Sequence, residues 1–244
     1  MRAQHRAMRT LYALAGAAAT AVAIPLLFAQ DYRAQRERLV RESMQGRGIS
    51  NPAVLKAMRE TPRHEFMPLD VRQFAYEDRP VPIGHEQTIS QPSLVAFMTE
   101  TLDIRKDHRV LEIGSGSGYQ AAILAALAKE VYTIEIVPAL ARSAAATFRR
   151  LNYRNIVARE GNGYAGWPDK APFDRIILTA APPELPQALV DQLKPGGRLV
   201  APVGRTPLEQ ELIVVDKSAA GKITRRSVLP VRFVPMVDKA PSKP

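Results

Sequence analysis

Short apolar runs rich in β-branched residues alternate with segments of helical periodicity through the second half of this 244-residue chain. The pattern predicts strands at 109–113, 131–136, 156–159, 173–179, 198–203, 211–215 and 227–234. Helices are predicted at 119–127, 138–151 and 185–193. Strands that alternate with helices indicate a largely parallel sheet.

The predicted fold class is therefore α/β: a doubly wound, Rossmann-like, mostly parallel sheet with helices on both faces. We expect a C-terminal antiparallel hairpin to close it around residues 216–222. Upstream, residues 36–59 favour two helices, the second beginning at Asn51 and Pro52. Residues 62–92 are rich in proline and are predicted to be irregular.

These patterns divide the chain into a leader at 1–35, a main domain at 36–237 and a tail at 238–244. Within the main domain, an N-terminal helical and loop region (36–108) precedes the Rossmann-like core (109–237).

The formal net charge of +10 lies at the two ends of the chain. Residues 1–41 carry +5 and residues 217–244 carry +6, so the intervening 42–216 carry −1. A nearly neutral body argues against a nucleic-acid partner. The chain has no cysteine, which excludes disulfides and thiolate catalysis, and its four scattered histidines predict no metal site.

A loop of three alternating glycines is the most informative local feature. Residues 109–118 read Arg-Val-Leu-Glu-Ile-Gly-Ser-Gly-Ser-Gly, so a predicted strand enters the glycines and a predicted helix follows them. The spacing is G-x-G-x-G, whereas dinucleotide folds prefer G-x-G-x-x-G. With its acidic residue included, the loop resembles motif I of S-adenosylmethionine (SAM) methyltransferases. The resemblance implies that Glu112, Gly114, Gly116 and Gly118 bind SAM; a nicotinamide oxidoreductase is a distant alternative.

Two further strand ends carry candidate cofactor ligands, because ligands of doubly wound sheets sit at the carboxyl ends of the strands. Glu135 ends the second predicted strand, and a carboxylate can accept hydrogen bonds from two vicinal ribose hydroxyls. Asn162 follows the third strand between two glycines, where it is expected to face an adenine edge. The alternatives are a solvated glutamate and a plain turn.

The fourth strand end bears on nucleic-acid substrates. Enzymes that methylate adenine in DNA carry an Asn/Asp-Pro-Pro-aromatic box here, to hold the flipped base. This chain has Ala181 before its two prolines and Glu184 after them, so base methylation is disfavoured.

Residues 82–92, Pro-Ile-Gly-His-Glu-Gln-Thr-Ile-Ser-Gln-Pro, are similar to the signature loop of protein-L-isoaspartate O-methyltransferases. Further stretches resemble that family in the same order, at 61–64, 75–78, 171–174 and 232–235. The likeness covers about residues 36–237.

The resemblance implies a SAM-dependent enzyme that methylates the α-carboxylate of isoaspartyl residues in damaged proteins and peptides, and so initiates their repair. It implies Ser90 as the catalytic residue and Ile83, His85, Thr88 and Ile89 as substrate-binding residues. A carboxylate is already ionised at neutral pH, so it needs no strong base. We expect a monomer that holds no metal.

Two departures from the family pattern keep an alternative open. The family usually has aspartate where Asn162 stands and glycine where Glu86 stands. A SAM-dependent methyltransferase with a different carboxylate or small-molecule acceptor is therefore the second hypothesis. A non-catalytic, membrane-tethered binding module that keeps the fold is the third.

The leader leaves the location open. Residues 11–29 are uncharged and follow Arg2, Arg6 and Arg9, which resembles a signal sequence or a short membrane anchor. Because SAM is made in the cytoplasm, we expect a cytoplasmic protein with possible membrane contact through 11–29. Export to the periplasm, membrane anchoring and a mis-assigned start codon are the alternatives.

Overall fold

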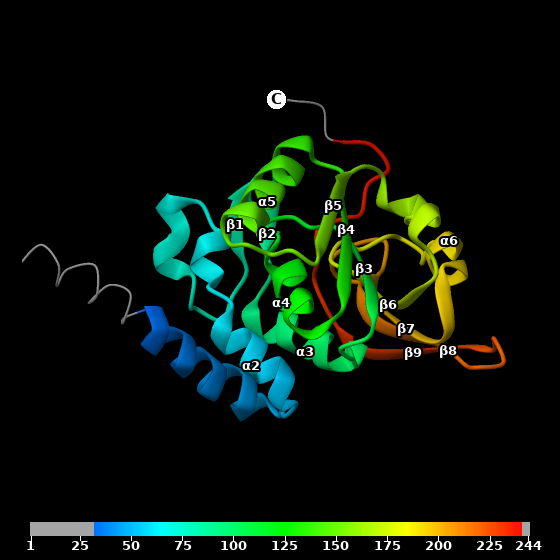
Figure 1. The fold of residues 1–244 in the computed structure, drawn as a ribbon, viewed down its shortest axis with the longest axis horizontal. Helices are drawn as coiled ribbons and strands as arrows, with labels where there is room; N and C mark the ends of the chain where they lie inside the picture. The colour runs from blue at the N-terminus through cyan, green and yellow to red at the C-terminus, as the bar shows by residue number, and fades with distance from the viewer. Residues whose placement is uncertain (1–31, 241–244) are drawn as a thin grey trace, which may run out of the picture.

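A seven-stranded sheet with helices on both faces forms the body of the computed structural model, which describes residues 32–240 (Figure 1). The strand order is β5-β4-β3-β6-β7-β8-β9. The strands are β3 (Arg109–Ile113), β4 (Glu130–Glu135), β5 (Ile156–Glu160), β6 (Phe173–Leu178), β7 (Leu193–Val203), β8 (Glu211–Lys217) and β9 (Ile223–Pro230). Neighbouring strands from β5 to β7 pair in parallel, whereas β8 and β9 join as antiparallel strands. The predicted fold class, including its C-terminal hairpin, is confirmed.

The central strands are buried on both faces, as parallel strands between helical layers must be. Val110 of β3 belongs to one apolar cluster, and Leu111 and Ile113 belong to the other. The helices are α2 (Pro52–Glu60), α3 (Pro92–Leu102), α4 (Tyr119–Leu127), α5 (Pro138–Arg150) and α6 (Gln187–Asp191). Helices α2, α3 and α4 pack together over the larger cluster, and α6 lies against β7 and η5 (Gly163–Ala165).

The N-terminal region is helical as expected, but its first helix ends in turns that are not α-helical. Residues 32–39 form a helix that continues into a π-turn η1 (Val40–Met44) and a 3-10 turn η2 (Gln45–Arg47). Asn51 then caps α2, and its side chain accepts from the backbone N–H groups of Ala53 and Val54 at 2.9 and 3.3 Å.

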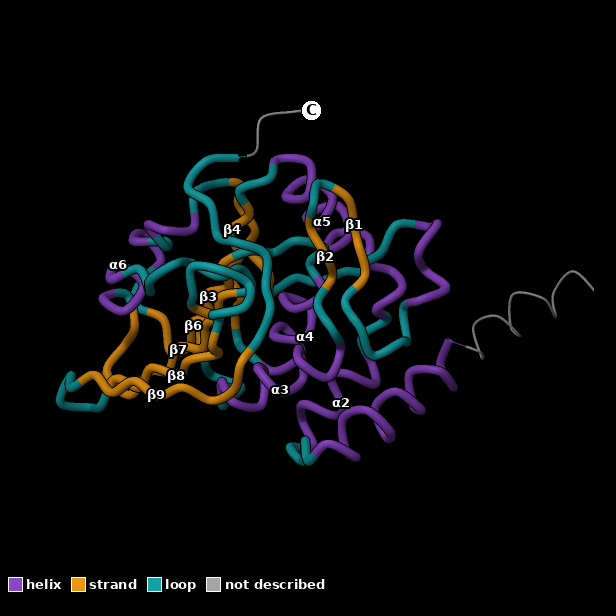
Figure 2. The backbone as a smooth tube through the Cα atoms, turned by 180° about the vertical axis from the view of Figure 1, so that it is seen from behind, coloured by secondary structure: helices purple, strands orange, loops and turns teal. Residues whose placement is uncertain are grey.

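The expectation that 62–92 lacks regular structure is wrong for part of that stretch. Two 3-10 turns, η3 (Arg63–Phe66) and η4 (Leu69–Phe74), precede an antiparallel hairpin of β1 (Val81–Gly84) and β2 (Gln87–Ile89). The hairpin stands apart from the main sheet (Figure 2). Its turn residues His85 and Glu86 have φ of 52° and 57°. Two-residue hairpin turns usually contain Asn-Gly or Asp-Gly. This turn contains neither, so the sequence pattern did not predict it.

Three predicted boundaries are also wrong. β7 begins at Leu193, because an irregularity in its pairing with β6 admits the Lys-Pro-Gly-Gly stretch that was expected to lie outside it. α6 is shorter than predicted and begins after Pro186. β9 ends at Pro230, and the apolar residues beyond it form an extended segment that returns to Ala181.

Within residues 32–240, no helix is both long and apolar enough to cross a bilayer. The predicted leader run at 11–29 lies outside the described residues.

Candidate active site at the carboxyl ends of the parallel strands

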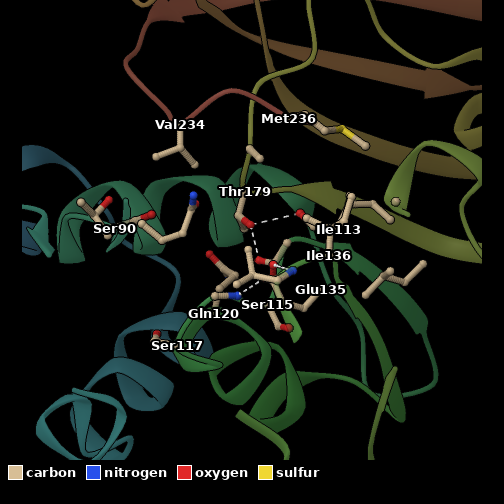
Figure 3. A pocket seen from close by; sticks show the side chains of 18 of the residues that line it. Ser90, Ile113, Ser115, Ser117, Gln120, Glu135, Ile136, Thr179, Val234 and Met236 are labelled. Atoms are coloured by element: carbon tan, nitrogen blue, oxygen red, sulfur yellow. Dashed lines mark hydrogen bonds between the residues drawn. The ribbon is translucent and has the colours of Figure 1, made fainter. Parts of the chain in front are cut away.

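The ends of β3, β4 and β6 border a cavity of about 240 Å³ (Figure 3). This position is a topological switch point, because the chain leaves β3 toward β4 on one side and β6 lies on the other. In Figure 3, Ser90 lies at one side of the cavity, Glu135 and Ile136 lie at the other, and Val234 and Met236 come from the segment after β9. We call this space the cofactor cavity.

The three predicted glycines have different structural roles, although all have positive φ. A Cβ on Gly114 would lie 2.6 Å from Thr179 Oγ1, and one on Gly118 would lie 2.7 Å from the Phe148 ring. The nearest atom to a Cβ on Gly116 is Ile83 Cδ1 at 3.9 Å. Gly114 and Gly118 thus permit close packing of the protein itself, and Gly116 leaves free space in the cavity wall.

Glu135 is fixed in the cavity wall by backbone N–H groups. Its Oε2 accepts from the N–H of Gly116 at 2.7 Å and its Oε1 accepts from that of Val137 at 2.9 Å. A carboxylate has about four acceptor positions, so each oxygen keeps one for a ligand hydroxyl. The same side chain therefore orders the glycine loop and offers acceptors to a ribose.

Glu112 lies behind the cavity and does not line it. Its Oε2 accepts from the Thr133 hydroxyl, and its Oε1 has no hydrogen-bond partner among the described residues. Complete burial raises the pKa of Glu112 to about 8, and the charge of Glu135 adds to the shift. Glu112 is accordingly protonated at neutral pH.

The Asn162 side chain is engaged with the protein. Its Oδ1 accepts from Tyr164 N–H at 2.8 Å, capping η5, and its Nδ2 donates to the Asp238 carbonyl at 3.0 Å. The flanking Gly161 and Gly163 line the cavity, whereas Asn162 does not. Contact of the Asn162 amide with adenine stays a prediction.

Thr88, Ile89 and Ser90 line the cavity at the start of α3. None of the described residues forms a hydrogen bond with the Ser90 hydroxyl. The N-cap of α3 is Gln91, which forms no side-chain capping bond. Ser90 therefore has no capping role, and its hydroxyl is free for a ligand.

Ile83 and His85, the other two predicted substrate residues, lie in the β1–β2 hairpin and not in the cavity wall. Ile83 is buried and faces Gly116, whereas His85 is exposed in the turn. Glu86, the departure from the family pattern, does line the cavity.

Several wall residues were not predicted as site residues. The Thr179 hydroxyl donates to the carbonyl oxygens of Ile113 (3.0 Å) and Gly114, which ties the end of β6 to the glycine loop. The position of Thr179 at the end of a predicted strand was the sequence feature that could have identified it as a site residue. Residues 234–237 close the cavity from beyond β9, and the family-like stretch at 232–235 was the sequence signal for the first two of them. Within residues 32–240, no cluster of acidic side chains and histidines could hold a metal ion.

Comparisons with known proteins agree with this geometry. The family described as protein-L-isoaspartate(D-aspartate) O-methyltransferase matches residues 34–241. A Gloeobacter violaceus protein-L-isoaspartate O-methyltransferase is 50% identical over 205 residues, which are 84% of this chain and 100% of that protein. Protein-L-isoaspartate O-methyltransferase 1 of Cupriavidus necator is 48% identical over 234 residues, which are 91% of this chain and 90% of the relative.

Solved structures point the same way. One protein-L-isoaspartate O-methyltransferase superposes with a TM-score of 0.73 at 31% identity, covering 84% of this chain and 67% of that one. A Plasmodium falciparum structure assigned to the same activity, in complex with S-adenosyl-L-homocysteine, has a TM-score of 0.72 at 26% identity and covers 84% of this chain and 99% of its own. The chain therefore belongs to the protein-L-isoaspartate(D-aspartate) O-methyltransferase family, whose members are SAM-dependent enzymes.

Proposed function

We propose that this chain transfers a methyl group from SAM to the α-carboxylate of isoaspartyl residues in damaged proteins and peptides, which starts their repair. The observation that carries the proposal is the position of Ser90. Its free hydroxyl lies in the wall of the cofactor cavity and also lines a second, larger cavity of about 970 Å³. An acceptor that enters through the larger cavity therefore meets the cofactor cavity at Ser90.

The residues of the cofactor cavity fit SAM. Gly116 leaves open space where a side chain would stand, and Glu135 keeps free acceptor positions for ribose hydroxyls. We propose that the apolar side chains of Ile136 and Met236, which also line the cavity, cover the adenine. When bound, SAM supplies an electrophilic methyl group on a sulfonium.

The chain's own task is to position the acceptor. An isoaspartyl carboxylate is ionised at neutral pH and is its own nucleophile. The Ser90 hydroxyl donates one hydrogen bond to it and leaves its charge in place. Holding two reactants in line contributes roughly 7–11 kcal/mol in favourable cases, so positioning alone accounts for a large rate increase.

The test is transfer of labelled methyl from SAM to an isoaspartyl peptide, detected as a base-labile ester that releases methanol. The matched aspartyl peptide is the control, and equal labelling of the two peptides would reject the proposal. For the role of Ser90, we expect Ser90→Ala to lower kcat roughly 10- to 100-fold with SAM affinity unchanged, since one hydrogen bond to a charged group is lost. Ser218→Ala, in the distant β8–β9 turn, should behave as wild type.

A different acceptor is the second candidate function. Glu86 lines the cofactor cavity beside the loop that should receive an anion, which favours a less negative acceptor. SAM binding by calorimetry without isoaspartyl methylation would select this candidate.

We also propose a cytoplasmic location, because the cofactor is made there. Cell fractionation with sequencing of the mature N-terminus tests it, since export would yield a periplasmic protein that lacks residues of the leader.

A further inference from the structure

The second cavity, about 970 Å³ in volume, adjoins the cofactor cavity. The two share Thr88, Ser90, Thr179, Val234 and Pro235 in their walls. We call this second space the flank groove, because a polypeptide whose acceptor residue reaches Ser90 must place its neighbouring residues there.

Much of the flank groove is apolar. Ile49, Leu94, Phe97 and Leu229 contribute to its wall, and Leu208 stands at its edge with 80% of its surface exposed. An apolar groove that opens beside Ser90 suits the side chains of a bound polypeptide.

The charged side chains of the flank groove are all positive. They are Arg47 and Arg232, and no carboxylate lines the groove. Arg47 is committed to the protein, because it pairs with Asp78 at 3.4 Å. Arg232 is exposed and forms no ion pair or hydrogen bond within the described part of the chain.

The backbone on both sides of Arg232 is anchored by one residue. Val231 N–H donates to the Gln210 carbonyl at 2.9 Å, and Phe233 N–H donates to Gln210 Oε1 at 2.6 Å. Gln210 Nε2 in turn donates to the Phe233 carbonyl at 3.1 Å. Val231 and Phe233 are buried, so the backbone from which the Arg232 side chain extends is held in place.

We propose that Arg232 is a specificity-determining residue: it pairs with a carboxylate side chain that flanks the isoaspartyl residue, so the enzyme prefers acidic damaged segments. This inference rests on the proposed function. A partly exposed pair of opposite charges contributes modestly, so the preference is a matter of a few-fold.

The experiment compares two isoaspartyl peptides that differ only in whether the flanking positions are Glu or Gln. At low ionic strength we expect kcat/KM to be about two- to fivefold higher for the Glu peptide. Salt should erase the difference. Arg232→Gln should abolish the preference, and Arg232→Glu should reverse it. Arg226→Gln removes the same charge from β9, outside the groove, and should keep the preference.

Peptide affinity, measured by fluorescence anisotropy in the presence of S-adenosyl-L-homocysteine, separates this inference from the proposed function. Equal affinity for the two peptides, or a preference that survives Arg232→Gln, overturns the role of Arg232 even where both peptides are methylated. Absence of methyl transfer to both peptides rejects the proposed function instead.

Discussion

The two walls of the cofactor cavity are built in different ways. The cofactor wall, formed by the glycine loop and the ends of β3 and β4, is held mostly by backbone hydrogen bonds to the sheet and within the loop. Gly114 N–H donates to the Ile134 carbonyl at 2.8 Å, and Gly118 N–H donates to that of Ser115 at 2.7 Å. The acceptor wall, formed by the β1–β2 hairpin and residues 231–235, of which Val234 and Pro235 line the cofactor cavity, lies outside the regular sheet apart from a single bridge at Pro235.

Side chains distant in sequence support the acceptor wall. Arg63 reaches the Ile89 carbonyl at 3.5 Å, and Gln210 holds Phe233. Because different interactions hold the two walls, we expect substitutions in them to have different consequences. Substitutions in the cofactor wall should affect the fold or SAM binding, whereas those in the acceptor wall should affect use of the acceptor.

The largest effect is expected within the glycine loop. Gly118→Ala combines positive φ with contact to the Phe148 ring, so we expect it to lower the free energy of unfolding by about 3 kcal/mol. Gly116→Ala meets the same backbone strain but no close atom, so it should fold and instead weaken SAM binding about tenfold. Urea denaturation and calorimetry measure the two effects. Equal losses of stability would contradict the distinction between packing and open glycines.

Arg63 provides the corresponding test of the acceptor wall. Its side chain is fully buried over the Tyr119 ring, its Nε and Nη1 have no hydrogen-bond partner, and no carboxylate pairs with it among the described residues. Burial lowers the pKa of Arg63 to about 10, so it stays charged at neutral pH. The carbonyl that it contacts belongs to the peptide bond joining Ile89 to Ser90, which places a cation behind the loop that receives an anion.

We expect Arg63→Met to leave the free energy of unfolding within about 1 kcal/mol of wild type, because removal of an unpaired buried charge offsets the lost contacts. The value of kcat/KM for the isoaspartyl peptide should fall about tenfold at constant SAM affinity. Arg63→Lys keeps the charge and should recover part of the rate. Wild-type kinetics in Arg63→Met would show that the cation does not act on the acceptor.

The same contrast explains why the cofactor wall was predicted from the sequence more completely than the acceptor wall. The bounds of β3 and α4 match their predictions because hydrophobic periodicity and the glycine loop are local signals. Glu135 was predicted from its place at a strand end, and it does line the cavity. The β1–β2 hairpin was missed for two reasons. Proline in β1 argues against a strand, and the turn residues His85 and Glu86 are not typical of a two-residue hairpin turn. The anchoring of Val231 and Phe233 by Gln210 joins residues more than twenty positions apart, and no local pattern encodes it.

Glu112 offers a smaller test, of the electrostatics beneath the cofactor wall. Its pKa is raised by burial from an ordinary 4.5 to about 8 in the folded chain. Between these values the folded state binds a proton that the unfolded state has lost, so the contribution of Glu112 to stability is complete below the lower pKa and decreases as pH rises. At most, the slope is about 1.4 kcal/mol per pH unit.

Glu112→Gln should remove that slope and make the protein more stable than wild type at pH 8, as measured by urea denaturation from pH 5 to pH 8 without cofactor. Glu130→Gln, a half-exposed position at the start of β4, is the matched control and should keep the slope. Parallel curves for wild type and Glu112→Gln would mean that Glu112 ionises normally in the folded chain.

Asn162→Asp should have the smallest effect, a minor change in SAM affinity. It tests whether the side chain at this position caps η5 or contacts adenine when SAM is bound. The aspartate keeps the acceptor for Tyr164 N–H and loses only the donor to the exposed Asp238 carbonyl. If the side chain caps η5 when SAM is bound, SAM affinity should change by no more than about threefold. If it turns to contact adenine, exchanging an amide for a carboxylate alters a direct ligand contact, and calorimetry should detect a larger change. A small effect would mean that this strand end contributes to the cofactor cavity through the backbone around Gly161 and Gly163 and not through the Asn162 side chain.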